Sequence, residues 1–201
     1  MGGGPETETM DHLQIRWYNQ YRARPSTEKW GNTMKDLYDQ FAYDYDRFGP
    51  IEAYLGNERD FLTRLFAEHD VKTVLDCACG TGNLSWELAA QGVQITGLDL
   101  SWDMLRIAGK KSRERGIQMP FIRQDMRKLL LHRPMDALFC ACDGVNYLVR
   151  PTDVQAFFCA ACKALRPGGG LFFDVFSEFK LSQKIGDNCL CNYNVAVTYI
   201  W

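Results

Sequence analysis

The sequence predicts an α/β protein built on a doubly wound, mostly parallel sheet with helices on both faces. From residue 72 onward, short apolar segments alternate with amphipathic ones, which is the pattern of strands that are each followed by a covering helix. Glycine and proline mark the turns between the segments. We expect strands at 73–78, 94–99, 120–124, 136–142 and 171–176, and helices at 82–91, 102–116 and 152–165, the last closed by Pro167 and Gly168–Gly170.

The N-terminal third has a different pattern. Residues 1–33 show no sustained period and are expected to form an extension. Leu37, Phe41, Tyr45 and Phe48 recur at helical spacing and predict a helix over 34–48 that Gly49 and Pro50 end, followed by a second helix over 51–69. We therefore divide the chain into an extension (1–33), a helical segment (34–70), the main domain (71–180) and a C-terminal segment (181–201).

Composition excludes several classes of protein. The chain has 201 residues, of which 46% are hydrophobic and 24% charged, as in an ordinary globular domain. Its net charge of -2 gives no overall basic field for nucleic acid or anionic membranes. No apolar stretch approaches the ~20 residues that span a bilayer. The N-terminus is polar and acidic and does not resemble a secretory signal, so we expect a cytoplasmic protein.

The eight cysteines form four closely spaced pairs. Thiolates two or three residues apart can bind zinc. In a cytoplasmic chain they are more often reduced thiols, and the pairs Cys77/Cys79 and Cys140/Cys142 lie in apolar runs. We interpret these pairs as packed core residues and predict no metal site.

The sequence VLDCACGTGNLSWELAAQG contains the strongest functional pattern, a buried strand followed by a glycine-rich turn and a helix. Gly80 and Gly82 permit tight turns and close approach of a ligand to the backbone. Asp76 ends the strand and can pair with a cationic ligand. Asp99 ends the next strand, where a carboxylate can bind both hydroxyls of a ribose.

Two other nucleotide-binding loops fit this pattern less well. A dinucleotide-binding GxGxxG places a third small residue at Ser85, but Asp76 would repel the pyrophosphate. The phosphate-binding loop of nucleotide hydrolases requires GK[ST] after its glycines, and that sequence is missing here.

With these motifs, residues from about 37 to 180 resemble the class I S-adenosylmethionine-dependent methyltransferases, which have a Rossmann-like fold. The resemblance includes GLDLSWDML, FIRQDM, MDALFCACDGVNYL and ALRPGGGLFFDVFS in the family's order. It implies S-adenosyl-L-methionine as cofactor, with Asp99 on the ribose and Asp125 on the adenine amine. The other cofactor contacts it implies are Asp76, Ala78, Cys79, Gly80, Gly82, Leu100, Met104, Met126 and Cys142.

Within that family the sequence is most similar to small-molecule enzymes, among them glycine N-methyltransferases and bacterial proteins of unassigned acceptor. YLGNER resembles a segment of the glycine enzymes that implies cofactor contacts from Tyr54 and Arg59. Asp143 occupies the position that implies an acceptor contact, and Tyr45 is expected to close the pocket from a lid formed by 34–70. We expect methyl transfer to a small molecule, with an amine nitrogen favoured, by in-line displacement.

Two alternatives stay open. Arg16, Arg22 and Arg24 lie among aromatic residues in the extension, so a nucleic-acid methyltransferase such as one acting on tRNA is the second hypothesis, less favoured because the core lacks an NPPY-type motif. A cofactor-binding fragment without activity is the third. Only 25 residues follow the expected fifth strand, whereas the family's sheet has seven strands. We therefore expect a truncated chain, or an incomplete sheet edge that pairs with a second copy.

Overall fold

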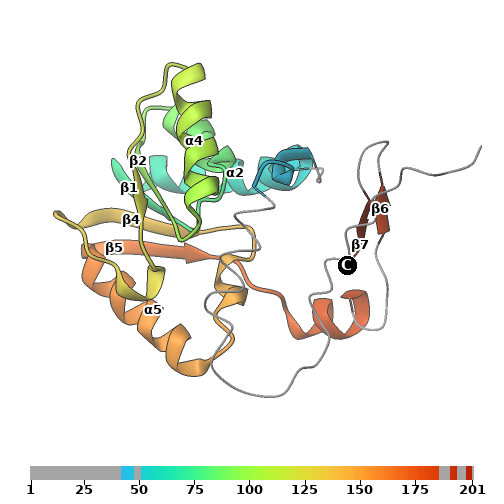
Figure 1. Ribbon diagram of the computed structural model, residues 1–201. Coiled ribbons are helices and arrows are strands. Elements are labelled where there is room, and N and C mark those ends of the chain that lie inside the picture. The colour runs from blue at the N-terminus through green and yellow to red at the C-terminus, as the bar shows by residue number, and fades with distance from the viewer. Residues whose placement is uncertain (1–41, 48–50, 186–190, 194–197, 201) are drawn as a thin grey trace, which may run out of the picture.

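The computed structural model describes residues 42–47, 51–185, 191–193 and 198–200 (Figure 1). Five parallel strands form one sheet in the order β3-β2-β1-β4-β5. The strands are β1 (Thr73–Cys77), β2 (Gln94–Asp99), β3 (Phe121–Arg123), β4 (Met135–Cys140) and β5 (Leu165–Phe173). This arrangement confirms the predicted α/β fold with a Rossmann-like parallel sheet.

Helices cover both faces of this sheet. One face is covered by α2 (Ile51–Glu68), α3 (Asn83–Ala89) and α4 (Trp102–Glu114), and the other by α5 (Pro151–Ala164) together with the short helix η2 (Met126–Lys128) (Figure 1). Two apolar clusters fill the layers, one built around Phe66, Leu88 and Phe139 and the other around Leu138 and Phe157. The alternation of side chains along each strand separates the two clusters.

The helices begin where the sequence supplies a suitable first residue. Ser101 precedes α4, and its hydroxyl accepts a hydrogen bond from the Met104 amide at 3.2 Å, which satisfies a donor of the first turn. Pro151 occupies the first position of α5, where its missing N–H costs nothing. The predicted bounds of these helices hold to within two residues.

The fifth strand departs from its prediction. We expected the segment RPGGG to be a turn and the strand to begin at residue 171, but β5 begins at Leu165 and ends at Phe173. Leu165 already pairs with Met135, and a bulge shifts the register before Gly170 pairs with Ala137. A Cβ on Gly169 would lie 2.8 Å from the Asp136 carbonyl oxygen, so glycine allows the two strands to approach.

The N-terminal segment also differs from its prediction. Residues 42–44 form a turn and η1 (Tyr45–Arg47) is a single 3₁₀ turn, so the described part of the expected 34–48 helix is not an α-helix. The expected extension, 1–33, lies outside the described residues, as does most of the 34–48 segment.

The C-terminal residues form short elements after the sheet. They are the π-type turn η4 (Lys180–Ile185) and an antiparallel pair, β6 (Cys191–Tyr193) with β7 (Thr198–Ile200). Among the described strands, β5 has one neighbour in the sheet, so the association of two copies through this edge stays a prediction.

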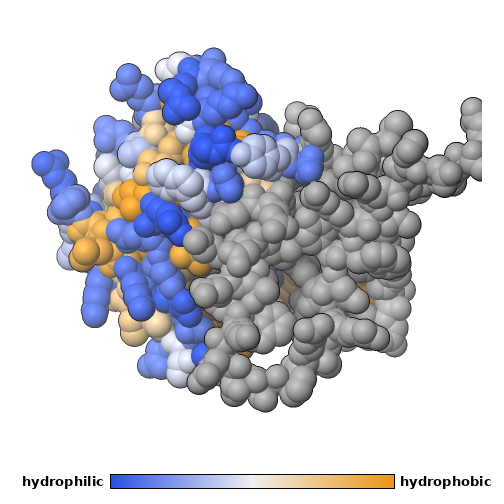
Figure 2. Space-filling view, in the orientation of Figure 1, coloured by the Kyte–Doolittle hydropathy of each residue, from blue (hydrophilic) through white to orange (hydrophobic). Residues whose placement is uncertain are grey.

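On the face shown in Figure 2, the described residues are mostly hydrophilic, with apolar patches between them. The most exposed large apolar side chains are Leu130 and Val149. Within the described part of the chain, no helix combines the length and apolar character needed to cross a membrane.

Candidate functional site

The carboxyl ends of β1 and β4 form the centre of the candidate site. The chain runs outward in one direction from β1 through β2 to β3 and in the other from β4 to β5, and ligands of such sheets bind where the strand order reverses. Backbone in the left-handed region is concentrated in the two loops there, at Ala78 (φ 61°), Gly80 (φ 54°) and Gly82 (φ 76°) after β1 and at Cys142 (φ 55°) and Asp143 (φ 63°) after β4. Residues other than glycine rarely adopt this conformation, and such strain is often found at functional sites.

The glycine-rich loop is attached to the end of β2. The Cys79 amide donates to the Leu98 carbonyl at 2.9 Å, and the Gly80 amide donates to Oδ2 of Asp99 at 2.8 Å. The other carboxylate oxygen of Asp99 accepts from the Ser101 amide at 2.8 Å. A carboxylate has about four acceptor positions, so Asp99 is held in place and keeps capacity for ribose hydroxyls.

Asp76 is buried directly beneath this loop. It is 3% exposed on the face of β1 that α3 covers, and the Ser85 hydroxyl donates to its Oδ2. Burial, opposed by the Ser85 hydrogen bond and assisted by the negative charges of Asp99 and Glu58, raises the pKa of Asp76 from 3.8 to about 8. A bound cation would reverse this effect by favouring the ionised carboxylate.

Glu58 on α2 is a site residue that the sequence analysis missed. Its Oε2 lies 3.9 Å from the thiol of Cys142, and its charge raises the pKa of Asp76. Burial, followed by the charge of Glu58, also raises the pKa of the Cys142 thiol, which therefore stays neutral. A helical carboxylate gives no local sequence signal, because only the fold shows which face of α2 meets the strand ends.

Arg59, the neighbour of Glu58, has other partners. Its guanidinium pairs with Asp60 at 2.9 Å and with Glu87 of α3 at 3.2 Å. The side chain of Tyr54 lies outside the described residues. The YLGNER segment thus supplies Glu58 to the site, and cofactor contacts from Tyr54 and Arg59 stay predictions.

The residues predicted to hold the adenosine part of the cofactor lie at and after the ends of β2 and β3. The Gln124 amide donates to the Asp99 carbonyl at 3.2 Å, which brings the ends of these strands together. Asp125 directly precedes η2 and forms a two-point pair with Arg127, which lowers the pKa of the carboxyl. Leu100 is 43% exposed and available to a flat ring, whereas Met104 is 1% exposed and serves the core beneath. Met126 is half-buried against the cluster around Phe157.

Asp143 forms an acid pair with Asp174, which directly follows β5. The Asp143 amide donates to both carboxylate oxygens of Asp174, at 3.1 and 3.0 Å, and Asn146 donates to the Asp143 side chain at 3.3 Å. Burial and the charge of Asp174 raise the pKa of Asp143 to about 6, while Lys180 opposes the rise. The sequence signal for Asp174 was an acid inside the apolar run expected to form the fifth strand, in FFDVFS.

Tyr45 enters the site from η1. Burial raises the pKa of its hydroxyl, and the nearby acidic groups of Cys142, Tyr147 and Asp99 contribute to the rise. These groups lie at the end of β2 and in the loop after β4, so Tyr45 lies near them, and its role in closing the pocket stays a prediction. At neutral pH its hydroxyl keeps its proton, which makes it a hydrogen-bond donor and not a base.

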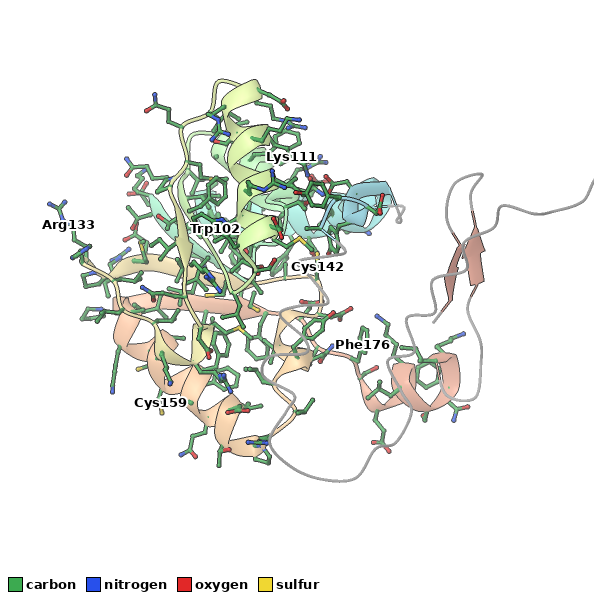
Figure 3. All side chains as sticks on the ribbon, viewed as in Figure 1. Trp102, Lys111, Arg133, Cys142, Cys159 and Phe176 are labelled. Carbon is green, nitrogen blue, oxygen red and sulfur yellow. The ribbon has the colours of Figure 1, made fainter. Side chains whose placement is uncertain are left out.

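Together these groups suit a cation that carries a ribose. Carboxyl groups of Asp76, Asp99, Glu58 and Asp143 lie near the ends of β1, β2 and β4, close to the Cys142 thiol, which burial keeps neutral. A Cβ on Gly80 would meet no atom within 4 Å, so the loop faces open space. Figure 3 shows Cys142 at the strand ends of this site. These acidic groups fit a sulfonium and an ammonium group better than phosphates.

The fold and this site define a class of nucleoside-binding transferases, and comparisons with known proteins give the family. Residues 74–169 match the family model described as "Methyltransferase domain". A protein of Geobacillus sp. strain WCH70, provisionally named a methyltransferase, is 32% identical over 167 residues, which are 82% of this chain and 67% of the relative. The chain belongs to the class I S-adenosylmethionine-dependent methyltransferases.

Other relatives differ in the acceptor that their names state. An S-adenosylmethionine-dependent methyltransferase from Clostridium acetobutylicum has a similar structure, with a TM-score of 0.71, 32% identity and coverage of 82% of this chain and 68% of that one. The sugar N-methyltransferase KedS8 from a Streptoalloteichus species has a TM-score of 0.57 at 25% identity, with 78% and 60% covered. A ubiquinone biosynthesis O-methyltransferase of Idiomarina loihiensis is 34% identical over 115 residues, 57% of this chain and 46% of the relative.

Proposed function

We propose that this protein transfers the methyl group of S-adenosylmethionine to an amine nitrogen of a small molecule. The observation that supports an amine is the acid pair of Asp143 with Asp174 beside the cofactor loops. Two neighbouring carboxyl groups attract a protonated amine more strongly than one does, whereas a phenolate or carboxylate acceptor would be repelled. KedS8, a structural relative, is named for an N-methyl transfer.

The protein's contribution to the reaction is mainly positioning. When bound, the cofactor supplies an electrophilic methyl group on a sulfonium. Asp99 and the glycine-rich loop would hold the ribose, and Asp76 would face the positive charge. Holding two reactants in line contributes roughly 7 to 11 kcal/mol where the geometry is good.

Asp143 would remove the proton from the amine. The acceptor arrives as an ammonium ion and must lose a proton before its lone pair can attack the methyl carbon. The pKa of Asp143 is raised to about 6, so the carboxylate is ionised at neutral pH and is a stronger base than an ordinary aspartate. The nitrogen–carbon bond then forms as the carbon–sulfur bond breaks.

An assay of methyl transfer from labelled cofactor to a panel of amines and phenols tests the proposal. We expect transfer to amines, with kcat/KM rising with pH through about 6 because Asp143 must be ionised. Asp143→Asn should lower kcat by about 100-fold or more, the usual contribution of a general base, and remove that rise.

Two further variants test the role of Asp174 and provide a control. Asp174→Asn should raise KM for the amine and lower the pH of the inflection, because a neighbouring negative charge is lost. Glu114→Gln is the matched control, since Glu114 is exposed on α4 and pairs only weakly with Lys110 at 3.7 Å. Transfer to phenols alone, or to tRNA alone, would overturn the proposal.

A further inference from the structure

Asp46 is the polar centre of the contact between η1 and the cofactor loop. Its Oδ1 accepts from the Thr81 hydroxyl at 2.7 Å and from the Asn83 side-chain amide at 3.0 Å. Thr81 belongs to the glycine-rich loop and is 1% exposed, and Asn83 is the first residue of α3. A single carboxylate therefore ties the N-terminal segment to the loop that follows β1.

Lys111 on α4 completes this cluster. Its ammonium pairs with Oδ2 of Asp46 and donates to Oδ1 of Asn83 at 2.7 Å. The Lys111 side chain is only 15% exposed, and Figure 3 shows it pointing from α4 toward η1. Burial lowers the pKa of Lys111 and the bond to Asp46 opposes this, while the bonds to Lys111, Thr81 and Asn83 hold the pKa of Asp46 below its usual value. The pairing thus favours the charged form of each group.

The cluster fixes a segment that carries site residues. Ala42 is 1% exposed, and the Arg106 guanidinium lies 4.9 Å above the Tyr43 ring, so residues 42–47 are attached to α4 at more than one point. Tyr45, next to Asp46, places its buried hydroxyl near Asp99 and Cys142. A change at Asp46 would therefore move Tyr45 and the glycine-rich loop together.

We propose that the ion pair of Asp46 with Lys111 is a latch that holds Tyr45 over the cofactor site and makes Asp46 a positioning residue for cofactor binding. The inference rests on cofactor binding by the family and does not depend on the nature of the acceptor. The latch joins three parts that are distant in the sequence, η1, the loop after β1, and α4. A half-buried ion pair suits this role because losing one partner leaves the other charge unsatisfied.

Titration calorimetry with S-adenosylmethionine and with S-adenosylhomocysteine tests the latch. Asp46→Asn and Lys111→Met should each raise the dissociation constant of both by about tenfold, the scale of a lost charge-assisted hydrogen bond. Lys111→Arg keeps the charge and should stay within about threefold of the wild type. The control Lys110→Met alters the adjacent, exposed lysine and should have no effect.

The double variant Asp46→Asn/Lys111→Met separates a latch from two independent contributions. It leaves no unpaired charge, so it should fold even where a single variant does not, and its affinity should equal that of one single variant. Hydrogen exchange at residues 42–47 and 78–82 should be faster in the single variants while the thermal midpoint changes little.

Three results would overturn the latch. They are wild-type affinity in both single variants, additive losses in the double variant, and binding by Lys111→Arg that is as weak as that of Lys111→Met. Failure of the wild-type chain to bind either nucleoside would instead count against the cofactor itself, so the two failures are distinguishable.

Discussion

Backbone strain is the clearest feature of the site at the scale of single residues. Ala78, Cys142 and Asp143 all have positive φ angles and all lie in the two loops at the centre of the sheet. The loops are in contact, because a Cβ on Gly144 would lie 3.3 Å from the Cβ of Ala78 and 2.6 Å from the sulfur of Cys140. The strained residues are thus held by close packing of one loop on the other.

Ala78→Gly tests whether this strain costs stability. An alanine in the left-handed region costs roughly 1 to 2 kcal/mol, whereas glycine adopts it freely but loses about 0.5 to 1 kcal/mol more backbone entropy on folding. We expect the free energy of unfolding to rise by about 0.5 to 1 kcal/mol, measured by urea titration. Gly80→Ala, a change in the opposite direction at φ 54°, is the control and should lower it. A loss of stability in Ala78→Gly would contradict this account.

At the scale of elements, Asp136 joins the starts of three strands. Its Oδ2 accepts from the amides of Lys72 and Thr73, both at 2.8 Å, and its Oδ1 pairs with Arg166 at 2.5 Å. These residues belong to or adjoin β1, β4 and β5, at the end of the sheet opposite to the site. The backbone bonds and Arg166 lower the pKa of Asp136 to about 2.

Asp136→Asn should therefore destabilise the sheet without touching the site. The amide keeps the shape but loses the charge, and we expect a loss of about 1 to 3 kcal/mol in the free energy of unfolding at pH 7. Because the folded pKa lies below the unfolded value, the carboxylate stabilises above about pH 4, and this stabilisation is lost as the pH falls toward 2. Urea titrations at pH 7 and pH 3 should show a smaller difference between wild type and variant at pH 3. Equal differences at the two values would contradict this role.

At the scale of the whole molecule, the sequence predicted what depends on local patterns. Apolar runs placed the five strands, and their carboxyl ends identified Asp76, Asp99 and Asp143 as candidate site residues. The pattern failed at β5, where glycines that signal a turn instead permit a bulge in a strand. Glycine gives the same local signal in both cases, and only the neighbouring strand distinguishes them.

The contacts that the sequence did not reveal join distant segments. Asp46 and Thr81 are 35 residues apart, Asp143 and Asp174 are 31 apart, and Glu58 and Cys142 are 84 apart. Each depends on the packing of a helix or loop against the sheet, which periodicity does not encode. Predicting such acids from a sequence requires the strand order first, because the order determines which loops are neighbours.

Cofactor binding at this acid-rich site should change the number of protons that the protein holds. Without a cation, burial keeps the pKa of Asp76 at about 8, so this carboxyl is mostly protonated at pH 7. A bound sulfonium favours the ionised form and lowers that pKa, so binding should release a proton. Affinity should consequently rise with pH up to about 8 and level off above it, because the proton no longer has to be displaced.

Calorimetry of S-adenosylmethionine binding at pH 7 in two buffers of different ionisation enthalpy measures this release directly. The observed heat should differ between the buffers by an amount that corresponds to roughly one proton or less per site. Asp76→Asn is the matched variant, since the amide resembles the protonated acid in shape and charge and can still accept the Ser85 hydroxyl bond. We expect this variant to fold and to bind the cofactor more weakly. Its binding heat should lose the part of the buffer dependence that arises from proton release by Asp76. Proton uptake by the wild type, or an equal release by the variant, would mean that Asp76 does not face the cofactor's positive charge.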